Sequence, residues 1–281
     1  MLTAEQRNEF DQYGIVRMPG AVAKSAAEEM LATVWNCLRD RYHIHRDAPD
    51  TWPGPEPGAV EVQQISGAHR FNGTRHLPKS ETFEQAGSAA VRGALDELLG
   101  AGNWQRPDRW GSLLVAFPES TDHFDVPSSN WHLDFPASCS SSGLTGVRIF
   151  TCLAKLPPGG GGTLFVAGSH KLVQNLAREG RIEHLPSADA RKRLIRAYPW
   201  VKALCSRDEK AGRVQRFMKN RTKVAGGVEM RVNEMTGEPG DVFLAHPLIL
   251  HAPAANCSAA PRFVLSATAF RCGVSPIKVY P

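Results

Sequence analysis

The sequence predicts a mainly β domain with flanking helices, arranged as a sandwich or a barrel. Short segments rich in β-branched and aromatic residues recur between positions 110 and 272. Clusters of Gly, Pro and Ser separate these segments, as turns separate the strands of all-β folds. Segments with apolar residues at helical spacing lie before them and between them, which accounts for the flanking helices.

The region 1–109 is predicted to be mainly helical and to support the β domain. A first helix is expected to end at Gly14, because glycine readily adopts the left-handed conformation of a helix end. A short strand is expected over Ile15–Met18. Apolar residues at helical spacing predict two further helices, over Lys24–Tyr42 and Ala89–Leu99.

Six segments are predicted as strands of the β core, which occupies residues 110–171 and 228–272. They are Ser112–Phe117, Gly146–Leu156, Gly162–Val166, Val228–Met235, Asp241–His251 and Arg262–Phe270. Residues 172–227 interrupt this pattern with helical stretches. We therefore expect a single domain over 1–281 in which the helical insertion 172–227 is a candidate lid.

The helical insertion is strongly basic. Between Leu176 and Gly227, fourteen Lys and Arg residues stand against five Asp and Glu, while the whole chain carries only +5. One interpretation is a solvated helical surface. The other is that some of these cations attract an anionic substrate such as a carboxylate or a CoA conjugate; the candidates are Arg191, Lys192, Arg193, Arg196, Arg213, Arg216 and Arg221.

Composition and targeting signals favour a soluble cytoplasmic enzyme or binding protein. The first thirteen residues are polar, unlike a signal peptide, and we expect no membrane association, because no apolar run approaches the ~20 residues of a membrane span. The six cysteines are scattered without a C-x-x-C pair, which is typical of reduced thiols. The basic residues lack interleaved aromatics, so we expect no nucleic-acid partner. The sequence does not indicate an oligomeric state.

Two histidines and one aspartate form the principal candidate site. His132 and Asp134 are two residues apart, so on an extended chain their side chains share one face. A distant His251 would complete two imidazoles and one carboxylate. This ligand set is that of the 2-His-1-carboxylate facial triad, which holds Fe(II) on one side and leaves positions open for chemistry.

Each part of this triad has a rival in the sequence. His123 and Asp125 repeat the same spacing, but among Ser, Thr and Pro residues that predict a loop. His246 precedes His251 by five positions and would face the opposite side of a regular strand. We interpret His246 as a packed or surface histidine.

Arg262 is the second candidate group. It follows His251 by eleven residues and opens an apolar strand, which favours a buried position with a partner. A buried guanidinium can grip a carboxylate with two parallel hydrogen bonds. Arg262 therefore suggests a diacid co-substrate beside the metal, although a surface or salt-bridging arginine is the commoner alternative.

These motifs together resemble the phytanoyl-CoA dioxygenase family of Fe(II)/2-oxoglutarate oxygenases. The resemblance rests on Trp131-His132-Leu133-Asp134, on the run Gly161–Lys171, on His246-Pro247-Leu248-Ile249-Leu250-His251, and on the order in which these segments and Arg262 occur. It implies a double-stranded β-helix core of the jelly-roll, cupin-like type.

The resemblance also implies roles for individual residues. His132, Asp134 and His251 would bind iron and serve catalysis, and Arg262 would pair with the distal carboxylate of 2-oxoglutarate. Phe150 falls where the family often has a Trp beside the co-substrate. Pro253 stands where relatives have a Ser that contacts the same carboxylate, so another group would have to supply that contact. Asp134 is retained, whereas halogenating relatives have a small residue there.

The expected function is that of a non-haem Fe(II)/2-oxoglutarate-dependent dioxygenase, with O2 as second co-substrate. Its default outcome would be hydroxylation of a small organic substrate with release of succinate and CO2. Desaturation, epoxidation and cyclisation are alternatives on the same scaffold, because the pocket sets the outcome. A different class of alternative is a non-catalytic cupin-like ligand-binding protein, in which the histidines are structural. The residues that bind substrate are not identified by the sequence.

Overall fold

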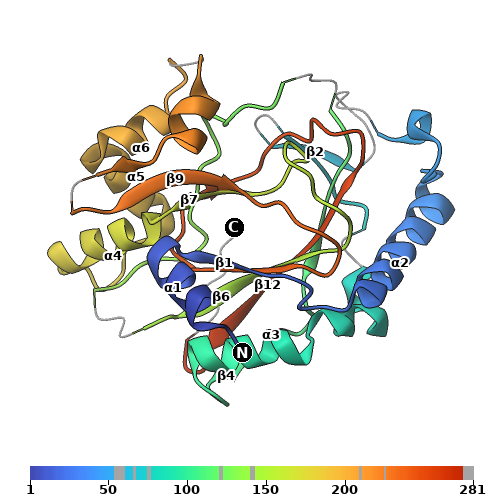
Figure 1. Ribbon diagram of the computed structural model, residues 1–281, viewed down its shortest axis with the longest axis horizontal. Coiled ribbons are helices and arrows are strands. Elements are labelled where there is room, and N and C mark those ends of the chain that lie inside the picture. Colours follow the sequence, from blue (N-terminus) through green and yellow to red (C-terminus); the bar gives the residue numbers. More distant parts are fainter. Residues whose placement is uncertain are drawn as a thin grey trace.

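Two antiparallel β-sheets face each other and enclose the centre of the molecule (Figure 1). The computed structural model describes residues 1–53, 61–65, 68–74, 77–119, 123–139, 143–208, 211–224 and 226–274. The larger sheet has the strand order β1-β10-β6-β12-β5-β3-β2, and β4 pairs with one end of β12. The smaller sheet has the order β11-β7-β9-β8. This arrangement confirms the predicted double-stranded β-helix core.

The strand bounds follow the apolar segments of the sequence. The larger sheet consists of β1 (Ile15–Met18), β2 (Val62–Ile65), β3 (Ala68–Phe71), β4 (Trp104–Gln105), β5 (Ser112–Ala116), β6 (Gly146–Cys152), β10 (Val242–Ala245) and β12 (Arg262–Arg271). The smaller sheet consists of β7 (Leu164–Ala167), β8 (Thr222–Lys223), β9 (Glu229–Glu234) and β11 (His251–Ala252). The N-terminal region thus contributes four strands to the larger sheet as well as helices.

Helices cover the outer faces of both sheets. They are α1 (Ala4–Tyr13), α2 (Lys24–Tyr42), α3 (Ala89–Leu99), α4 (Ser169–Glu179), α5 (Ser187–Ala197) and α6 (Pro199–Leu204). Short helical turns lie at η1 (Pro49–Thr51), η2 (Leu77–Lys79), η3 (Glu81–Ala86) and η4 (Val214–Lys219). The predicted bounds of α2 and α3 are confirmed, and Gly14 ends α1 with a left-handed φ of 77°.

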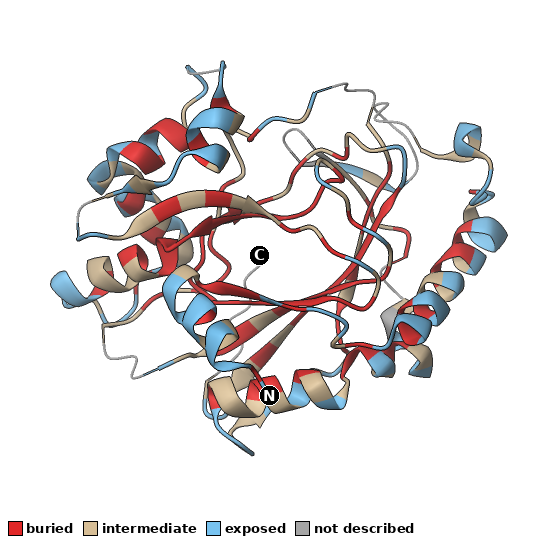
Figure 2. Ribbon diagram, viewed as in Figure 1, coloured by how far each residue is buried: buried red, intermediate tan, exposed pale blue. Residues whose placement is uncertain are grey.

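Buried residues are concentrated in the strands of both sheets and on parts of the surrounding helices (Figure 2), and they form three layers. One layer joins α2 and α3 to the outer face of the larger sheet, through residues such as Val34 and Leu265. A second joins α4 to α6 and η4 to the outer face of the smaller sheet, through Leu164 and Val232. The third lies between the sheets and includes Phe165. The candidate site borders this inner layer.

The helical insertion is therefore packed on the outer face of the smaller sheet. Leu164 and Val166 of β7 point toward it, whereas Phe165 points between the sheets. The insertion is helical as predicted, with the short strand β8 near its end. Its role as a lid stays a prediction.

The predicted single strand over Asp241–His251 was wrong. The chain leaves the larger sheet after β10 and turns, with the Ile249 N–H donating to the His246 carbonyl at 3.0 Å. It then enters the smaller sheet as β11. Pro247, which has no N–H to donate to a ladder, lies at this crossing. His246 and His251 consequently belong to different sheets.

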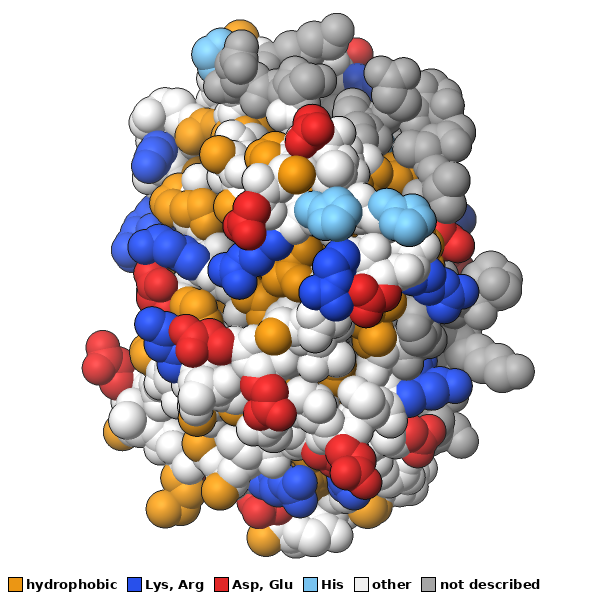
Figure 3. Space-filling view, turned by 90° about the vertical axis from the view of Figure 1, so that its right-hand side faces the viewer, with side chains coloured by type: hydrophobic (Ala, Val, Ile, Leu, Met, Phe, Trp, Pro, Cys, Tyr) orange, Lys and Arg blue, Asp and Glu red, His pale blue; other side chains and the backbone are white. Residues whose placement is uncertain are grey.

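The outer surface mixes charges of both signs. On the side of the molecule that bears α2, acidic and basic side chains are interspersed over the described residues (Figure 3). All six cysteines are free thiols. Within the described ranges, no helix has the length and apolar character that a membrane span requires.

Candidate metal centre

Backbone pairing places two of the predicted ligands directly opposite each other. His132 and His251 form an isolated antiparallel bridge with reciprocal N–H···O bonds of 2.9 and 3.0 Å. The segment around His132 therefore extends the edge of the smaller sheet beyond β11. Asp134 follows in a bend rather than in a regular strand. The shared face predicted from the spacing is present although the strand is limited to one bridge.

Neighbouring apolar side chains hold this segment in register. Trp131 is buried, and its indole N–H donates to the Pro127 carbonyl at 2.7 Å. Leu133 is also buried, and both side chains belong to the layer between the helical insertion and the smaller sheet. Because side chains alternate along an extended chain, these two anchors direct His132 and Asp134 to the other side.

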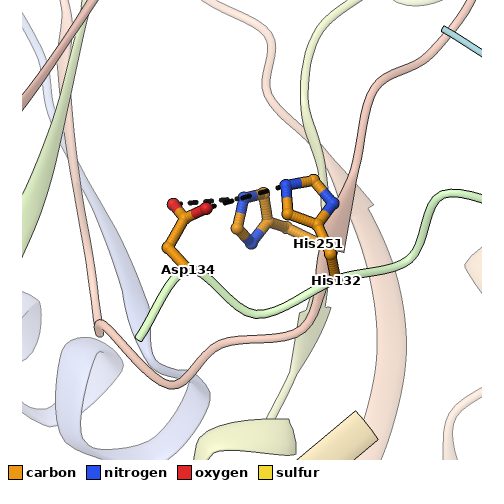
Figure 4. A group of neighbouring side chains, drawn as sticks. All are labelled: His132, Asp134 and His251. Carbon is orange, nitrogen blue, oxygen red and sulfur yellow. Dashed lines mark ion pairs between the residues drawn. The ribbon is translucent and has the colours of Figure 1, made fainter. Parts of the chain in front are cut away.

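The three predicted ligands converge in space (Figure 4). One potential ligand atom from each of them lies within 4.8 Å of the other two. Nε2 of His132 is 3.7 Å from Asp134 Oδ1, and Nε2 of His251 is 3.5 Å from Oδ2. The side chains of Asp134 and His251 are 4% and 8% exposed, whereas that of His132 is 43% exposed. The cluster is thus buried on one side and open beside His132.

Backbone carbonyls orient both imidazoles. Nδ1 of His132 lies 2.7 Å from the Asn130 carbonyl, and Nδ1 of His251 lies 3.0 Å from the Ile249 carbonyl. A carbonyl only accepts, so Nδ1 must carry the proton in each ring, which leaves the Nε2 lone pair free toward Asp134. Asn130 reaches its position with a left-handed φ of 61°, a conformation that Asn tolerates better than most residues.

The ionisation states suit a divalent metal. Burial lowers the pKa of His251 to about 4, against the opposing attraction of Asp134, so this imidazole is neutral at physiological pH. Burial opposes ionisation of Asp134. Electrostatic attraction from His251, Arg148 and His132 is stronger than this burial effect and holds the pKa of the Asp134 carboxyl below its ordinary value. The cluster therefore offers a neutral imidazole from His251, a second imidazole from His132 and a carboxylate.

Arg148 is a member of this site that the sequence analysis missed. Its Nε lies 3.0 Å from Asp134 Oδ2. Its two terminal nitrogens donate to Thr268 Oγ1 at 3.0 Å and to Ser266 Oγ at 2.8 Å. These hydroxyls on β12 fix the guanidinium from the side opposite Asp134. The sequence did contain an indication of this position: Arg148 is two residues from Phe150 in a predicted strand, so the two side chains share one face of the sheet.

Arg262 is buried, as expected, at the start of β12. One terminal nitrogen donates to the Gly161 carbonyl, while Nε has no hydrogen-bond partner and, among the described residues, no carboxylate pairs with the guanidinium. Burial lowers the pKa of Arg262 to about 10, with a further lowering by Arg70 that Glu119 partly opposes. A buried, incompletely satisfied cation of this kind is suited to an anionic ligand.

Arg70 is a second cation near Arg262 that the sequence analysis missed. Arg262 is opposite Ala116 on β5, and Phe71 on β3 is opposite Val115. Arg70 therefore points to the same face of the sheet as Arg262, across the small side chain of Ala116. The nearby Glu119 is engaged by His69, 3.2 Å from its carboxylate. Positive charge is consequently in excess at this end of the space between the sheets.

Phe150 lies between the sheets in the inner layer. Its ring is 5.5 Å from that of Phe165, which in turn is stacked on His251 at 6.0 Å. The guanidinium of Arg148 lies 5.3 Å from the centre of the Phe150 ring. Phe150 is thus close to the metal centre on an apolar surface, which is compatible with the predicted place beside a co-substrate.

The rival histidines do not join the metal cluster. Asp125 accepts a hydrogen bond from the adjacent Val126 N–H, and the His123–Asp125 pair is not part of the cluster. His246 is buried against His170, with ring centres 4.7 Å apart, and its Nδ1 accepts the Leu248 N–H. The interpretation of His246 as a packed residue is confirmed.

One of the basic residues proposed to attract substrate has a structural position instead. Arg213 is buried and donates to the carbonyls of Leu204, Val126 and Pro127 at 2.6, 2.7 and 3.0 Å. These bonds tie the helical insertion to the loop that precedes Trp131. Arg213 is therefore not one of the surface cations that could attract an anionic substrate.

The fold and the cluster define a double-stranded β-helix protein with two histidines and one carboxylate at a shared point. The family model for phytanoyl-CoA dioxygenase (PhyH) matches residues 10–264. The chain therefore belongs to the phytanoyl-CoA dioxygenase family and has the fold of an Fe(II)/2-oxoglutarate oxygenase. No curated protein matches the sequence closely enough to indicate a nearer relative.

Solved structures share this fold at low sequence identity. The epimerase SnoN in complex with Fe3+, alpha ketoglutarate and nogalamycin RO is 18% identical, with a TM-score of 0.54 over 95% of this chain and 82% of that chain. The alpha ketoglutarate-dependent carbocyclase SnoK from nogalamycin biosynthesis is 17% identical, with a TM-score of 0.54 over 96% and 84%. HygX from Streptomyces hygroscopicus, with nickel and 2-oxoglutarate bound, is 15% identical, with a TM-score of 0.51 over 97% and 88%.

Proposed function

We propose that this chain is an Fe(II)- and 2-oxoglutarate-dependent dioxygenase that hydroxylates a small organic substrate. The observation that carries the proposal is the convergence of two imidazoles and one carboxylate, in a fold that also holds an incompletely satisfied buried guanidinium. Family membership supports the same chemistry.

His132, Asp134 and His251 would hold the iron. Two imidazoles and one carboxylate are the ligand set of non-haem Fe(II) oxygenases, and three protein ligands leave positions for co-substrates. Asp134 Oδ2 is buried and accepts no well-aligned hydrogen bond, although Arg148 Nε lies 3.0 Å and His251 Nε2 3.5 Å from it, so its lone pairs stay available to a metal ion. Arg148 would fix the orientation of this carboxylate from behind, as outer residues commonly do at metal sites.

Arg262 would hold the distal carboxylate of 2-oxoglutarate, and Arg70 would assist it. Both cations face the space between the sheets, and together they exceed the charge of Glu119. Pro253 has no hydroxyl for this carboxylate. Arg70 is the group that could replace the contact expected of a Ser there.

Ferrous iron and 2-oxoglutarate, when bound, supply the oxidation: O2 and 2-oxoglutarate are consumed, succinate and CO2 are released, and one oxygen atom enters a substrate C–H bond. The chain's own contribution is positioning and exclusion of water. Phe150, Phe165 and Val264 present apolar surface beside the cluster. Substrate would approach on the open side, where the His132 imidazole is partly exposed.

Other oxidative outcomes are a second candidate function. Structures with the same fold include an epimerase and a carbocyclase. The pocket rather than the metal ligands selects among such outcomes. Product analysis by mass spectrometry separates them, because hydroxylation adds one oxygen atom, whereas epimerisation leaves the substrate mass unchanged.

Two measurements test the proposal. Anaerobic addition of Fe(II) and 2-oxoglutarate should produce a weak metal-to-ligand charge-transfer band in the visible spectrum. A screen of carboxylic acids, acyl-CoAs and natural-product scaffolds should then find compounds that stimulate succinate formation. If folded, iron-loaded protein shows no such band, the non-catalytic cupin-like binding protein becomes the better explanation.

A further inference from the structure

A pocket of about 360 Å³ opens at the seam between the two sheets, where β1 of the larger sheet lies beside β9 of the smaller. We call it the seam pocket and define it by Ile15, Phe165, Phe243, Arg231 and Asn233. Small-molecule sites are commonly concave, mostly apolar and of about 300–1,000 Å³, with a few polar groups. The volume of the seam pocket falls in this range, and apolar and polar side chains line it in similar measure.

The floor of the seam pocket is apolar and belongs to the inner layer. Ile15 and Phe243 come from the larger sheet, and Phe165 and Met235 come from the smaller one. Phe165 is also the residue whose ring is stacked on His251. A single aromatic side chain therefore borders both the seam pocket and the metal centre.

One wall of the seam pocket carries two polar side chains without partners. The register pairs Phe165 with Asn233 and Ala167 with Arg231, so Asn233 and Arg231 point between the sheets with Phe165. Both are half-buried, and neither makes a side-chain hydrogen bond or an ion pair with a described residue. They are two positions apart on β9, about 7 Å along the strand. Such a pair offers a guanidinium and an amide to one ligand.

The remaining charges leave this wall positive. Arg17, at the β1 side, is paired with Asp241. Both carboxylate oxygens of Glu234 accept the Gly159 N–H, at 2.9 and 3.0 Å, and burial raises the pKa of Glu234 to about 7. Lys219, at the end of η4, adds a cation to the lining, and Glu9 adds the one remaining carboxylate.

We propose that the seam pocket binds a small organic carboxylate with an apolar body. The acid group would pair with the Arg231 guanidinium and the Asn233 amide, and the apolar body would lie against Phe165 and Phe243. A guanidinium binds a carboxylate bidentately, whereas the apolar floor disfavours a polyanion. The site needs neither iron nor 2-oxoglutarate, so it goes beyond the proposed oxygenase activity.

Binding of 4-fluorophenylacetate to the metal-free full-length protein, followed by 19F NMR, tests this proposal. Arg231→Gln should weaken binding about tenfold, because one charge-assisted pair is lost. Arg46→Gln is the matched control: it removes the same charge from an exposed site outside the seam pocket, between α2 and η1, and should leave binding unchanged. The neutral analogue 4-fluorophenylacetamide should bind about tenfold more weakly than the acid.

Three results would overturn the assignment. They are no binding of the acid, equal binding to the wild type and Arg231→Gln, and displacement of the acid by 2-oxoglutarate in the presence of Zn(II), which would place it at Arg262. If Arg231→Gln does not fold, as judged by circular dichroism, Asn233→Ala should still weaken binding several-fold. Because no turnover is measured, failure of the oxygenase proposal would leave these outcomes interpretable.

Discussion

Replacement of Arg262 by Met separates a ligand-binding arginine from a structural one. Burial and the nearby Arg70 lower its pKa from 12.5 to about 10. At ~1.4 kcal/mol per pKa unit, keeping this guanidinium charged costs the fold about 3 kcal/mol. Its hydrogen bond to the Gly161 carbonyl offsets about 2 kcal/mol, the usual contribution of a bond from a charged donor. The apo variant should therefore lie within about 1 kcal/mol of the wild type.

The Arg262→Met substitution should weaken the binding of 2-oxoglutarate far more than it changes stability. Loss of two charge-assisted hydrogen bonds to the distal carboxylate costs roughly 3 kcal/mol, which raises the 2-oxoglutarate requirement by about 100-fold. The assays are thermal unfolding without ligand and succinate formation against 2-oxoglutarate concentration. A melting temperature lowered by more than about 5 °C would contradict the stability reasoning, because ~1 kcal/mol corresponds to only about 2–4 °C in a chain of this size. An unchanged 2-oxoglutarate requirement would refute the role of Arg262.

Three further predictions concern the metal, pH and the insertion. His132→Ala or Asp134→Ala should abolish iron binding and turnover, measured by iron content and succinate release, whereas His123→Ala should retain both. Burial lowers the pKa of His170 to about 4, so on acidification the unfolded chain takes up this proton before the folded protein does, and stability falls as the pH drops below 6.5. Between pH 7.5 and 5, His170 should lower the free energy of urea unfolding by about 2 kcal/mol. The variant His170→Gln should not show this loss. An equal acid loss in that variant would exclude His170 as the source. Arg213→Met should destabilise the protein by about 3 kcal/mol in the same assay, because it leaves buried carbonyls without donors; unchanged unfolding would mean that Arg213 does not anchor the insertion.

Local sequence signals predicted the helices well, and they singled out residues that the fold brings together at the candidate metal centre. Helices α2 and α3 have the predicted bounds because apolar spacing and end signals are local properties. His132 and Asp134 could be identified because they alternate with the apolar residues Trp131 and Leu133, which are buried, and this alternation is visible in four consecutive residues. The distant His251 required the additional support of family motifs.

Features that depend on tertiary pairing could not be predicted in the same way. The break between β10 and β11 depends on a crossing from one sheet to the other. The proximity of Arg70 to Arg262 depends on β3 and β12 flanking β5. Arg213 carries the same charge as its neighbours in the insertion, and only the fold shows that it is buried.

The most direct test of the metal assignment is anomalous diffraction at the iron absorption edge, from crystals soaked with Fe(II) without oxygen. We expect one strong peak bonded to Nε2 of His132, Nε2 of His251 and the carboxylate of Asp134, with addition of 2-oxoglutarate extending density from the metal toward Arg262. Iron bound at another place, or these three side chains directed away from the peak, would contradict the assignment.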